Sequence, residues 1–542
     1  MTDGARRASG IGRTSLGASA GTLGSTVIGF GRTLALAAAI GTGLVADSYN
    51  IANQVPNQVF LLLGGGTVGF VFVPQLIRHA RFSEKRGDEY GSLLLLGGAI
   101  FGLFVTIALI ALSPTVIRLM GGSSWGAAQS SLGLHLSLWC IPQIFFYALY
   151  SVASQLMNAR GRFSSVAGIP TVNSVVVILA CIPIIVVGTV QTNAPESVRP
   201  WEIWLLGGST LLGSAVQAIL LIIVLRAIGF KLSYRFPLRG LGLRATVATG
   251  LFTLVAAASF QVANLVTAGI STQAGSAAKA LGFDGRGYTA FFYARTLLLV
   301  AQSVASASLA NVLLQRLSGH YAGGDKETAA DELNEAILAV GAFLIPVMAG
   351  IICLGPLGTE LLFTRGETSS AAAHYIGIVL AVLAFGLLPY ALHDLLIRPF
   401  FAVHNAKRVL QSSAFISAIW IAGAFSAGIF LPPEHVPIGI AAAFGLSYLI
   451  DLPLKLWSLH NSLSFRISSG VARGYLRALA AGGVAAIITG AILMYAEQFV
   501  TPNWLTRAAL LIVGIALFFL VYYPLTARSS MSLGRLLRWL KT

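Results

Sequence analysis

Apolar residues gather into long uninterrupted stretches, and short polar segments separate them. Each stretch has about the ~20 residues that an α-helix needs to cross the hydrocarbon core of a bilayer. We count fourteen stretches, at approximately residues 23–45, 48–77, 91–113, 132–157, 166–190, 203–226, 245–270, 288–317, 333–357, 374–403, 410–431, 437–460, 476–497 and 504–526. Backbone polar groups cannot stay unpaired in lipid, so continuous runs form helices, whereas a β-barrel would show alternation. The pattern predicts an all-α integral membrane protein with 14 transmembrane helices.

Composition excludes the set of soluble domains that length alone would suggest. The chain has 542 residues, of which 56% are hydrophobic and 10% are charged, whereas soluble domains carry about 25% charged residues. The three cysteines, Cys140, Cys181 and Cys353, lie inside apolar runs without the spacing of a disulfide framework or a metal site. We expect them to pack at lipid depth, and we expect no metal.

The positions of the cations indicate how the helices are oriented. Lys and Arg together number 35 against 19 Asp and Glu, a net charge of +16. With the N-terminus in the cytoplasm, 26 of the cations fall on cytoplasmic segments and helix ends, and six fall on the opposite side. Membrane insertion produces this bias. The first residues lack an apolar core with a cleavage site, so the tail is expected to stay attached. Both termini are therefore expected to be cytoplasmic, and the charge implies anionic lipids rather than nucleic acid.

An internal repeat divides the chain. Residues 142–160 (PQIFFYALYSVASQLMNAR) and 389–407 (PYALHDLLIRPFFAVHNAK) both place an Asn-Ala-basic exit sixteen residues after a proline. Both copies run in the same direction, so we expect parallel repeats related by a pseudo-twofold axis along the membrane normal, as in transporters with a site at the repeat interface. The predicted parts are a cytoplasmic tail (1–22), an N-lobe of six spans (23–240), a C-lobe of six spans (241–470), and two extra helices with a cytoplasmic C-terminal tail (471–542).

Three arginines inside the predicted spans are the first candidates for substrate binding: Arg32, Arg295 and Arg398. A cation at the bilayer centre costs roughly 2.5 to 3.5 kcal/mol on insertion scales, so it usually faces an aqueous cavity or a partner. Instead of facing a cavity, Arg32 could pair with Asp47 or a helix-end carbonyl. Arg295 could instead extend its side chain to the outer interface. Arg398 follows Asp394 by four residues, which favours a structural pair on one helix face.

Polar residues near the start of the second span are further candidates for substrate binding. Asp47 is either the N-cap of this helix or one side of a gate ion pair with a cavity arginine. Asn53 and Asn57 either line the transport path or hold helices together through hydrogen bonds.

Helix breakers then interrupt the same span: Pro56, Gly64, Gly65 and Gly66. Such breaks are tolerated in a membrane where the backbone lines a cavity or packs on protein. We expect a hinge for alternating access here, and close packing through small residues is the alternative.

Catalytic and cofactor motifs are missing from the sequence. It has no nucleotide-binding loop, nucleophile elbow, zinc motif or pair of catalytic carboxylates. We therefore expect a transporter rather than an enzyme, without a cofactor. A membrane potential or ion gradient would drive it, at ~2.3 kcal/mol per charge per 100 mV. The sequence leaves the ion open, with proton coupling through His393 and Asp394 as one alternative.

Several motifs resemble one known family. The run IGFGRTLALAAAIGTGLVADSYNIANQVPNQVF and the following FVPQL are similar to the first two helices of the MurJ/MviN lipid II flippases, which carry a GFxR element, an A-D element and a PN pair. PQIFFYAL, NARGRF and LIRPFFAVHNAK resemble that family's fourth, fifth and tenth helices. By this resemblance Arg32, Arg295 and Asp47 match the family's GFxR arginine, eighth-helix arginine and second-helix aspartate. The chain departs from the family at four places. It has Thr26 and Phe60 where the family often has Arg, Gly65–Gly66 where Glu-Gly is frequent, and Gln315 where Pro is frequent.

The resemblance implies the multidrug/oligosaccharidyl-lipid/polysaccharide exporter fold, with a cationic cavity between the lobes and a groove for a polyprenyl tail beside the extra helices. It implies movement of lipid II, the undecaprenyl-diphosphate-linked disaccharide-pentapeptide, from the inner to the outer leaflet of the bacterial plasma membrane by alternating access. Guanidinium groups suit this substrate because they bind phosphate oxygens bidentately.

The expected partners follow from the same resemblance. They are the lipid-linked diphosphate, membrane lipids and proteins of cell-wall synthesis and division. A polysaccharide-repeat lipid flippase and a non-transporting cell-wall assembly scaffold are the alternatives, the second because of the missing family charges. A cation-coupled drug exporter would instead need carboxylates to dominate the cavity.

Overall fold

The computed structural model describes residues 21, 24–64, 83–160, 162–233, 243–323, 325–403, 405–499, 501 and 503–527. Within these residues the chain is helical apart from short turns and one isolated bridge between Gln191 and Ala194. The predicted all-α class is therefore confirmed. The chain divides into two compact units, Met1–Ser276 and Ala277–Thr542.

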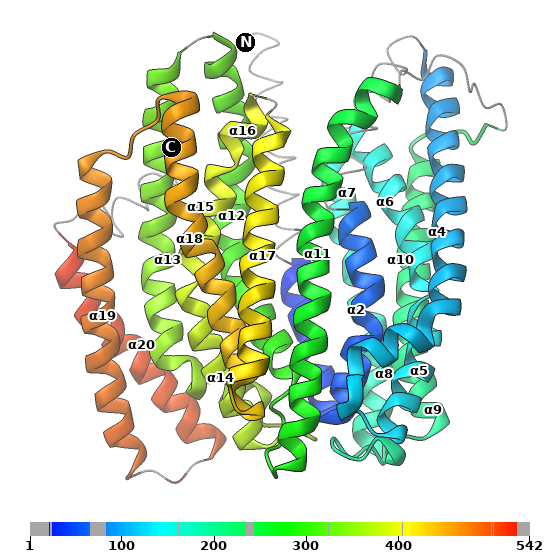
Figure 1. The fold of residues 1–542 in the computed structure, drawn as a ribbon, viewed down its shortest axis with the longest axis vertical. Helices are drawn as coiled ribbons and strands as arrows, with labels where there is room; N and C mark the ends of the chain where they lie inside the picture. Colours follow the sequence, from blue (N-terminus) through cyan, green and yellow to red (C-terminus); the bar gives the residue numbers. More distant parts are fainter. Residues whose placement is uncertain are drawn as a thin grey trace. The chain divides into compact units, whose positions relative to one another are not determined.

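The first unit contains long membrane-type helices and a few short ones (Figure 1). They are the helix Gly24–Ile40, α2 (Leu44–Gly64), α4 (Glu84–Gly121), α5 (Ala127–Cys140), α6 (Gln143–Ala159), α7 (Phe163–Gly168), α8 (Pro170–Val187), α9 (Pro200–Ile203), α10 (Ser209–Ala227) and most of α11 (Leu243–Ala280). A buried apolar cluster joins the first helix, α2, α5, α8 and the segment around α9. Cys140 and Cys181 belong to it, and all three cysteines are free, as predicted.

The second unit continues from the end of α11. Its helices are α12 (Tyr288–Gly323), α13 (Lys326–Phe363), α14 (Ser370–Phe385), α15 (Leu387–Leu396), α16 (Arg398–Ala402), α17 (Ala406–Phe430), α18 (Val436–Leu463), α19 (Ser469–Glu497) and α20 (Trp504–Thr526). The two extra helices, α19 and α20, pack against α13 (Figure 1). Small side chains make this contact close, because Ala349, Ala481 and Ala485 lie together with Phe518 and Tyr522.

Every predicted span coincides at least in part with a helix. Ten helices of the described residues are long and apolar enough to cross a membrane, and eleven if the bent pair of α14 with α15 is one span. The other three predicted spans fall on the shorter helix Gly24–Ile40, on α2 and on α12. That these three helices cross the membrane stays a prediction, and so does the total of fourteen transmembrane helices.

A helix break lies at the start of the first copy of the internal repeat, and another lies just before the second copy. In the first copy α5 ends at Cys140 and α6 begins at Gln143, around Pro142, which has no N–H to continue the helical ladder. Just before the second copy the chain bends by 43° between α14 and α15, at Gly386. A Cβ on Gly386 would lie 2.6 Å from the Cα of Gly445 in α18, so only glycine permits this approach. The crossing places α15 directly against α18.

Candidate functional site

Arg32 is held by neutral partners inside the first unit. Its Nη1 donates to Oδ1 of Asn173 and its Nη2 to the hydroxyl of Tyr49, each over 3.4 Å. Tyr147 of α6 is also close enough to interact electrostatically. Arg32 forms no ion pair with any carboxylate of the described residues, so the predicted alternative of a pair with Asp47 is wrong. Because its neighbours are neutral, the guanidinium retains its charge for an anion.

Asp47 lies one turn inside α2 rather than at its cap. The helix begins at Leu44, and the carbonyl of Thr192 accepts from the backbone N–H of Val45 over 3.0 Å. The predicted N-cap role is therefore wrong. The Asp47 side chain is buried, with 1% of its surface exposed, and Thr272 of α11 donates to its carboxylate over 3.5 Å. A carboxylate in the first turn is still favoured by the helix dipole.

Asn53 connects α2 to the surroundings of Arg32. Its Oδ1 accepts from Nε2 of Gln143 over 3.2 Å, and the Oε1 of Gln143 accepts from the hydroxyl of Tyr147 over 3.0 Å. Asn57 follows on the same face of α2, four residues later, and is half-buried. Gln143 and Tyr147 were not predicted as site residues. They stand in PQIFFYAL, a segment that indicates the internal repeat and the family resemblance but does not by itself indicate a site.

Pro56 lies within α2, and the helix continues through it to Gly64. Gly65 and Gly66 lie outside the described residues. The hinge remains a prediction.

Arg295 has an aromatic environment in the second unit. Its guanidinium carbon lies 5.6 Å from the ring centre of Trp420 and 5.8 Å from that of Phe444, within cation–π range. Tyr390 and Tyr448 are close enough to interact with its charge. These rings come from α15, α17 and α18, so sequence spacing gave no signal for them. Arg295 lies within the helix and is half-buried.

Arg398 forms the predicted same-face pair. Its Nη2 donates to both carboxylate oxygens of Asp394, over 3.1 and 3.2 Å. Both side chains remain partly exposed. The carboxylate occupies the guanidinium, so Arg398 is a weaker candidate for substrate than Arg32 or Arg295.

The sequence analysis missed a buried ionic cluster, which we call the α15–α18 cluster: His393, Ser412, Asp451 and Lys455. Asp451 accepts from the hydroxyl of Ser412 over 2.7 Å and lies 3.2 Å from the ammonium of Lys455. Lys455 is one of the 26 cations that the sequence pattern places on cytoplasmic segments and helix ends, and in the structure only 4% of this residue is exposed. The i,i+4 spacing of Asp451 and Lys455 inside an apolar span was the available signal.

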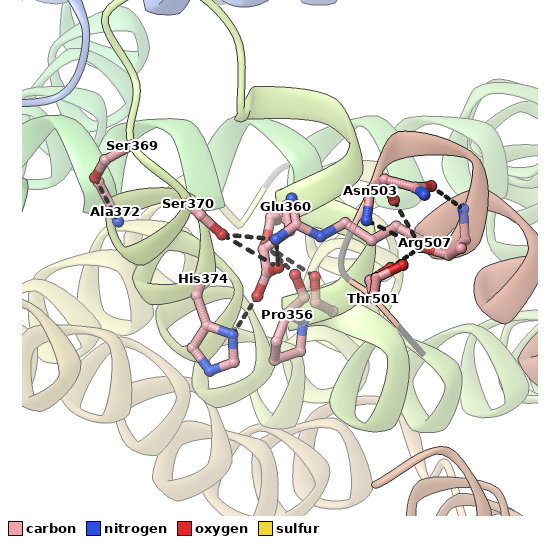
Figure 2. Close-up of polar contacts among 12 residues, drawn as sticks. Pro356, Glu360, Ser369, Ser370, Ala372, His374, Thr501, Asn503 and Arg507 are labelled. Atoms are coloured by element: carbon pink, nitrogen blue, oxygen red, sulfur yellow. Dashed lines mark hydrogen bonds and ion pairs between the residues drawn. The ribbon is translucent and has the colours of Figure 1, made fainter. Parts of the chain in front are cut away.

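A second polar cluster fixes the extra helices to the unit. Figure 2 shows Glu360 of α13 between His374 of α14 and Arg507 of α20. Arg507 Nη2 lies 2.9 Å from one carboxylate oxygen, and His374 Nδ1 lies 2.6 Å from the other. Arg507 also donates to the hydroxyl of Ser370 over 2.8 Å. Among the described residues no group of His, Cys, Asp and Glu has the arrangement of a metal site.

Solved structures define the class of protein. An inward-facing multidrug resistance MATE family transporter of the MOP superfamily matches with a TM-score of 0.65 at 15% identity, over 81% of this chain and 95% of that one. A lipid II flippase MurJ in an inward closed conformation matches with a TM-score of 0.72 at 19% identity, over 94% of this chain and 99% of that one. The chain therefore has the fold of this transporter superfamily.

Sequence comparison gives the particular family. A family model described as lipid II flippase MurJ matches residues 36–514. The chain is 23% identical over 499 residues to a probable lipid II flippase MurJ of Rhizobium meliloti (strain 1021), which covers 89% of this chain and 85% of the relative. The chain belongs to the MurJ family of lipid II flippases, and it is accordingly a multi-pass membrane protein.

Proposed function

We propose that this chain moves lipid II from the inner to the outer leaflet of the bacterial plasma membrane by alternating access, with Arg32 as a diphosphate-binding group of the first unit. One observation carries the assignment of this residue: a guanidinium inside an apolar helical unit is surrounded by Asn and Tyr side chains instead of a carboxylate. Keeping a charge at this depth is costly unless it serves a ligand.

The chemistry of the two arginine environments fits such a lipid. Asn173 and Tyr49 orient the guanidinium of Arg32, and a planar guanidinium binds two phosphate oxygens side by side. The aromatic rings beside Arg295 lie within cation–π range of a second guanidinium, which is the second candidate group for the diphosphate. Transport of this kind requires no catalytic group. The proposal also places both termini in the cytoplasm and includes contacts with proteins of cell-wall synthesis and division.

The direct test measures leaflet translocation of labelled lipid II in vesicles that contain the purified chain. Arg32→Ala should lower the rate roughly ten- to a hundredfold, because a hydrogen bond to a charged group contributes about 1.5 to 3 kcal/mol. Arg32→Lys should retain part of it, since the charge stays but the planar fork is lost. Arg118→Ala is the matched control, because Arg118 is exposed and, within the part of the chain that the structure describes, its side chain bonds the backbone of its own helix only. Wild-type rates in both Arg32→Ala and Arg295→Ala would contradict the proposal.

A polysaccharide-repeat lipid flippase is the second candidate. The observation that favours it is Phe60, which packs on Tyr147 at 4.6 Å between ring centres, near Arg32. An aromatic surface at this position suits a sugar ring as well as it suits packing. Depletion in the native host separates the two candidates. Accumulation of lipid II supports the leading proposal, whereas intact peptidoglycan synthesis with loss of a surface glycan supports the second.

A further inference from the structure

The α15–α18 cluster contains three titratable side chains in mutual contact. Nδ1 of His393 lies 2.9 Å from Oδ2 of Asp451 and 2.5 Å from Nζ of Lys455. Asp451 and Lys455 are 3% and 4% exposed. Arg32 belongs to the other unit, and the aromatic environment of Arg295 does not use these groups.

One ring nitrogen of the cluster has two incompatible neighbours. If Nδ1 of His393 carries a lone pair, it accepts from the ammonium of Lys455. If Nδ1 carries a proton, it donates to the carboxylate of Asp451. It cannot do both, because a neutral imidazole has one donor and one acceptor nitrogen and an imidazolium has two donors. Where Nε2 keeps its proton, the two arrangements differ by one proton, because the first holds a neutral imidazole and the second an imidazolium.

A groove reaches this cluster from the surface of the unit. Its volume is about 270 Å³, and Asp451, Lys455 and Ser412 line its polar part. Arg408, Gln411 and Trp457 also line it, and these three side chains are exposed. The groove supplies both a route for a proton and a space into which the Lys455 side chain can turn.

We propose that the α15–α18 cluster is a proton-binding site, in which Nδ1 of His393 takes up a proton and the ammonium of Lys455 leaves Asp451 for the groove. The lone pair of Nδ1 forms the new N–H bond, and this N–H then donates to Asp451. The proton comes from hydronium of the surrounding water, whose O–H bond breaks to leave water, and no bond within the cluster breaks. The cluster gains one positive charge. The ligand is the proton that energises the transport cycle. The role of this proton in the transport cycle rests on the proposed flippase function, whereas the binding of the proton to His393 does not.

The charges around His393 agree with this assignment. Asp394, the acid expected from the sequence to act with His393, is paired with Arg398 instead. Tyr448 of α18 packs against the imidazole at 5.2 Å between ring centres, and Tyr390 lies one turn before it on α15. Arg295 of α12 interacts with both tyrosines. The ammonium of Lys455 is the cation that contacts Nδ1 of His393, so a proton added to Nδ1 repels this ammonium and displaces it from Asp451.

A metal cation is a poorer ligand for the same place. His393 and Asp451 provide one nitrogen and one carboxylate, and within the described residues no third ligand completes a metal set. The ammonium of Lys455 already occupies the position beside the carboxylate.

Proton binding is testable without any lipid substrate. Proteoliposomes of the full chain are adsorbed on a solid-supported membrane and acidified rapidly, and the transient charge displacement is recorded. We expect a transient in the wild type and its loss in His393→Gln and in Asp451→Asn. Lys455→Met should keep the transient and show it after a smaller acidification, because the competing ammonium is gone. His460→Gln is the matched control, since among the described residues the ring of this histidine of α18 forms a hydrogen bond to the backbone carbonyl of Phe465 and none to a carboxylate.

Two results would overturn the site: no transient in the wild type, or a transient of wild-type size in His393→Gln. Thermal unfolding of each variant identifies loss of folding, and Lys455→Met still tests the site if His393→Gln does not fold. Since no lipid II is present, a negative result here leaves the flippase proposal unaffected, and failed lipid translocation leaves the proton site unaffected.

Discussion

Three arginines that look alike in the sequence have different partners in the structure. Arg32 contacts an amide and a phenol, Arg295 lies against aromatic rings, and Arg398 is bound by Asp394. Only the last could be assigned from the sequence, because an i,i+4 pair is local. The partners of the other two come from helices far along the chain. The environment of Arg32 is the more valuable signal, because an amide and a phenol do not neutralise its charge as the carboxylate of Asp394 neutralises that of Arg398.

Arg398→Gln should leave lipid II translocation within about twofold of the wild type. A partly exposed i,i+4 pair contributes about 0.3 to 0.5 kcal/mol, and the guanidinium is already engaged by Asp394. The vesicle assay used for Arg32 measures this, with Asp394→Asn as the matched variant. A tenfold loss in Arg398→Gln with normal rates in Asp394→Asn would make Arg398 a substrate contact after all.

At the scale of elements, the helices could be predicted and their breaks could not. Apolar runs predict helices because lipid leaves the backbone no other partners. The bend at Gly386 depends instead on Gly445, which is brought to it by the tertiary fold. The burial of Lys455 could not be predicted for a related reason: a lysine near the end of an apolar run usually reaches solvent, and only the contacts with His393 and Asp451 show that this one is buried.

One ionic contact joins the start of α20 to α13, in addition to the apolar packing of the extra helices. Arg507→Ala removes the ion pair with Glu360 and the bond to Ser370 (Figure 2). We expect a loss of about 1.5 kcal/mol in local stability, since hydrogen bonds to charged groups contribute about that much. Hydrogen exchange in the first turns of α20 should then be roughly tenfold faster. Arg473→Ala is the control, because this exposed arginine of α19 bonds only its own helix. Unchanged exchange in Arg507→Ala would show that apolar packing alone fixes α20.

At the scale of the whole molecule, the distribution of cations predicts the side of each loop. This prediction depends on the number of membrane crossings. The bent pair of α14 with α15 decides that number, because the pair is either one crossing or none. If the pair is one span, the loop after α13 and the loop after α18 lie on opposite sides, because three crossings separate them. If the pair is re-entrant, the two loops lie on the same side.

Cysteine labelling in cells distinguishes these arrangements. Glu367 follows α13, Arg466 follows α18, and both are exposed. In a Cys353→Ala background, where the remaining cysteines are buried, an impermeant maleimide should label Glu367→Cys in intact cells and Arg466→Cys only after permeabilisation. Lys326→Cys, at the start of α13, should behave like Arg466→Cys, because one crossing separates it from Glu367. Labelling of Arg466→Cys from outside would make α14 and α15 a re-entrant pair. It would also reverse the predicted side of the C-terminus, since α19 and α20 add an even number of crossings.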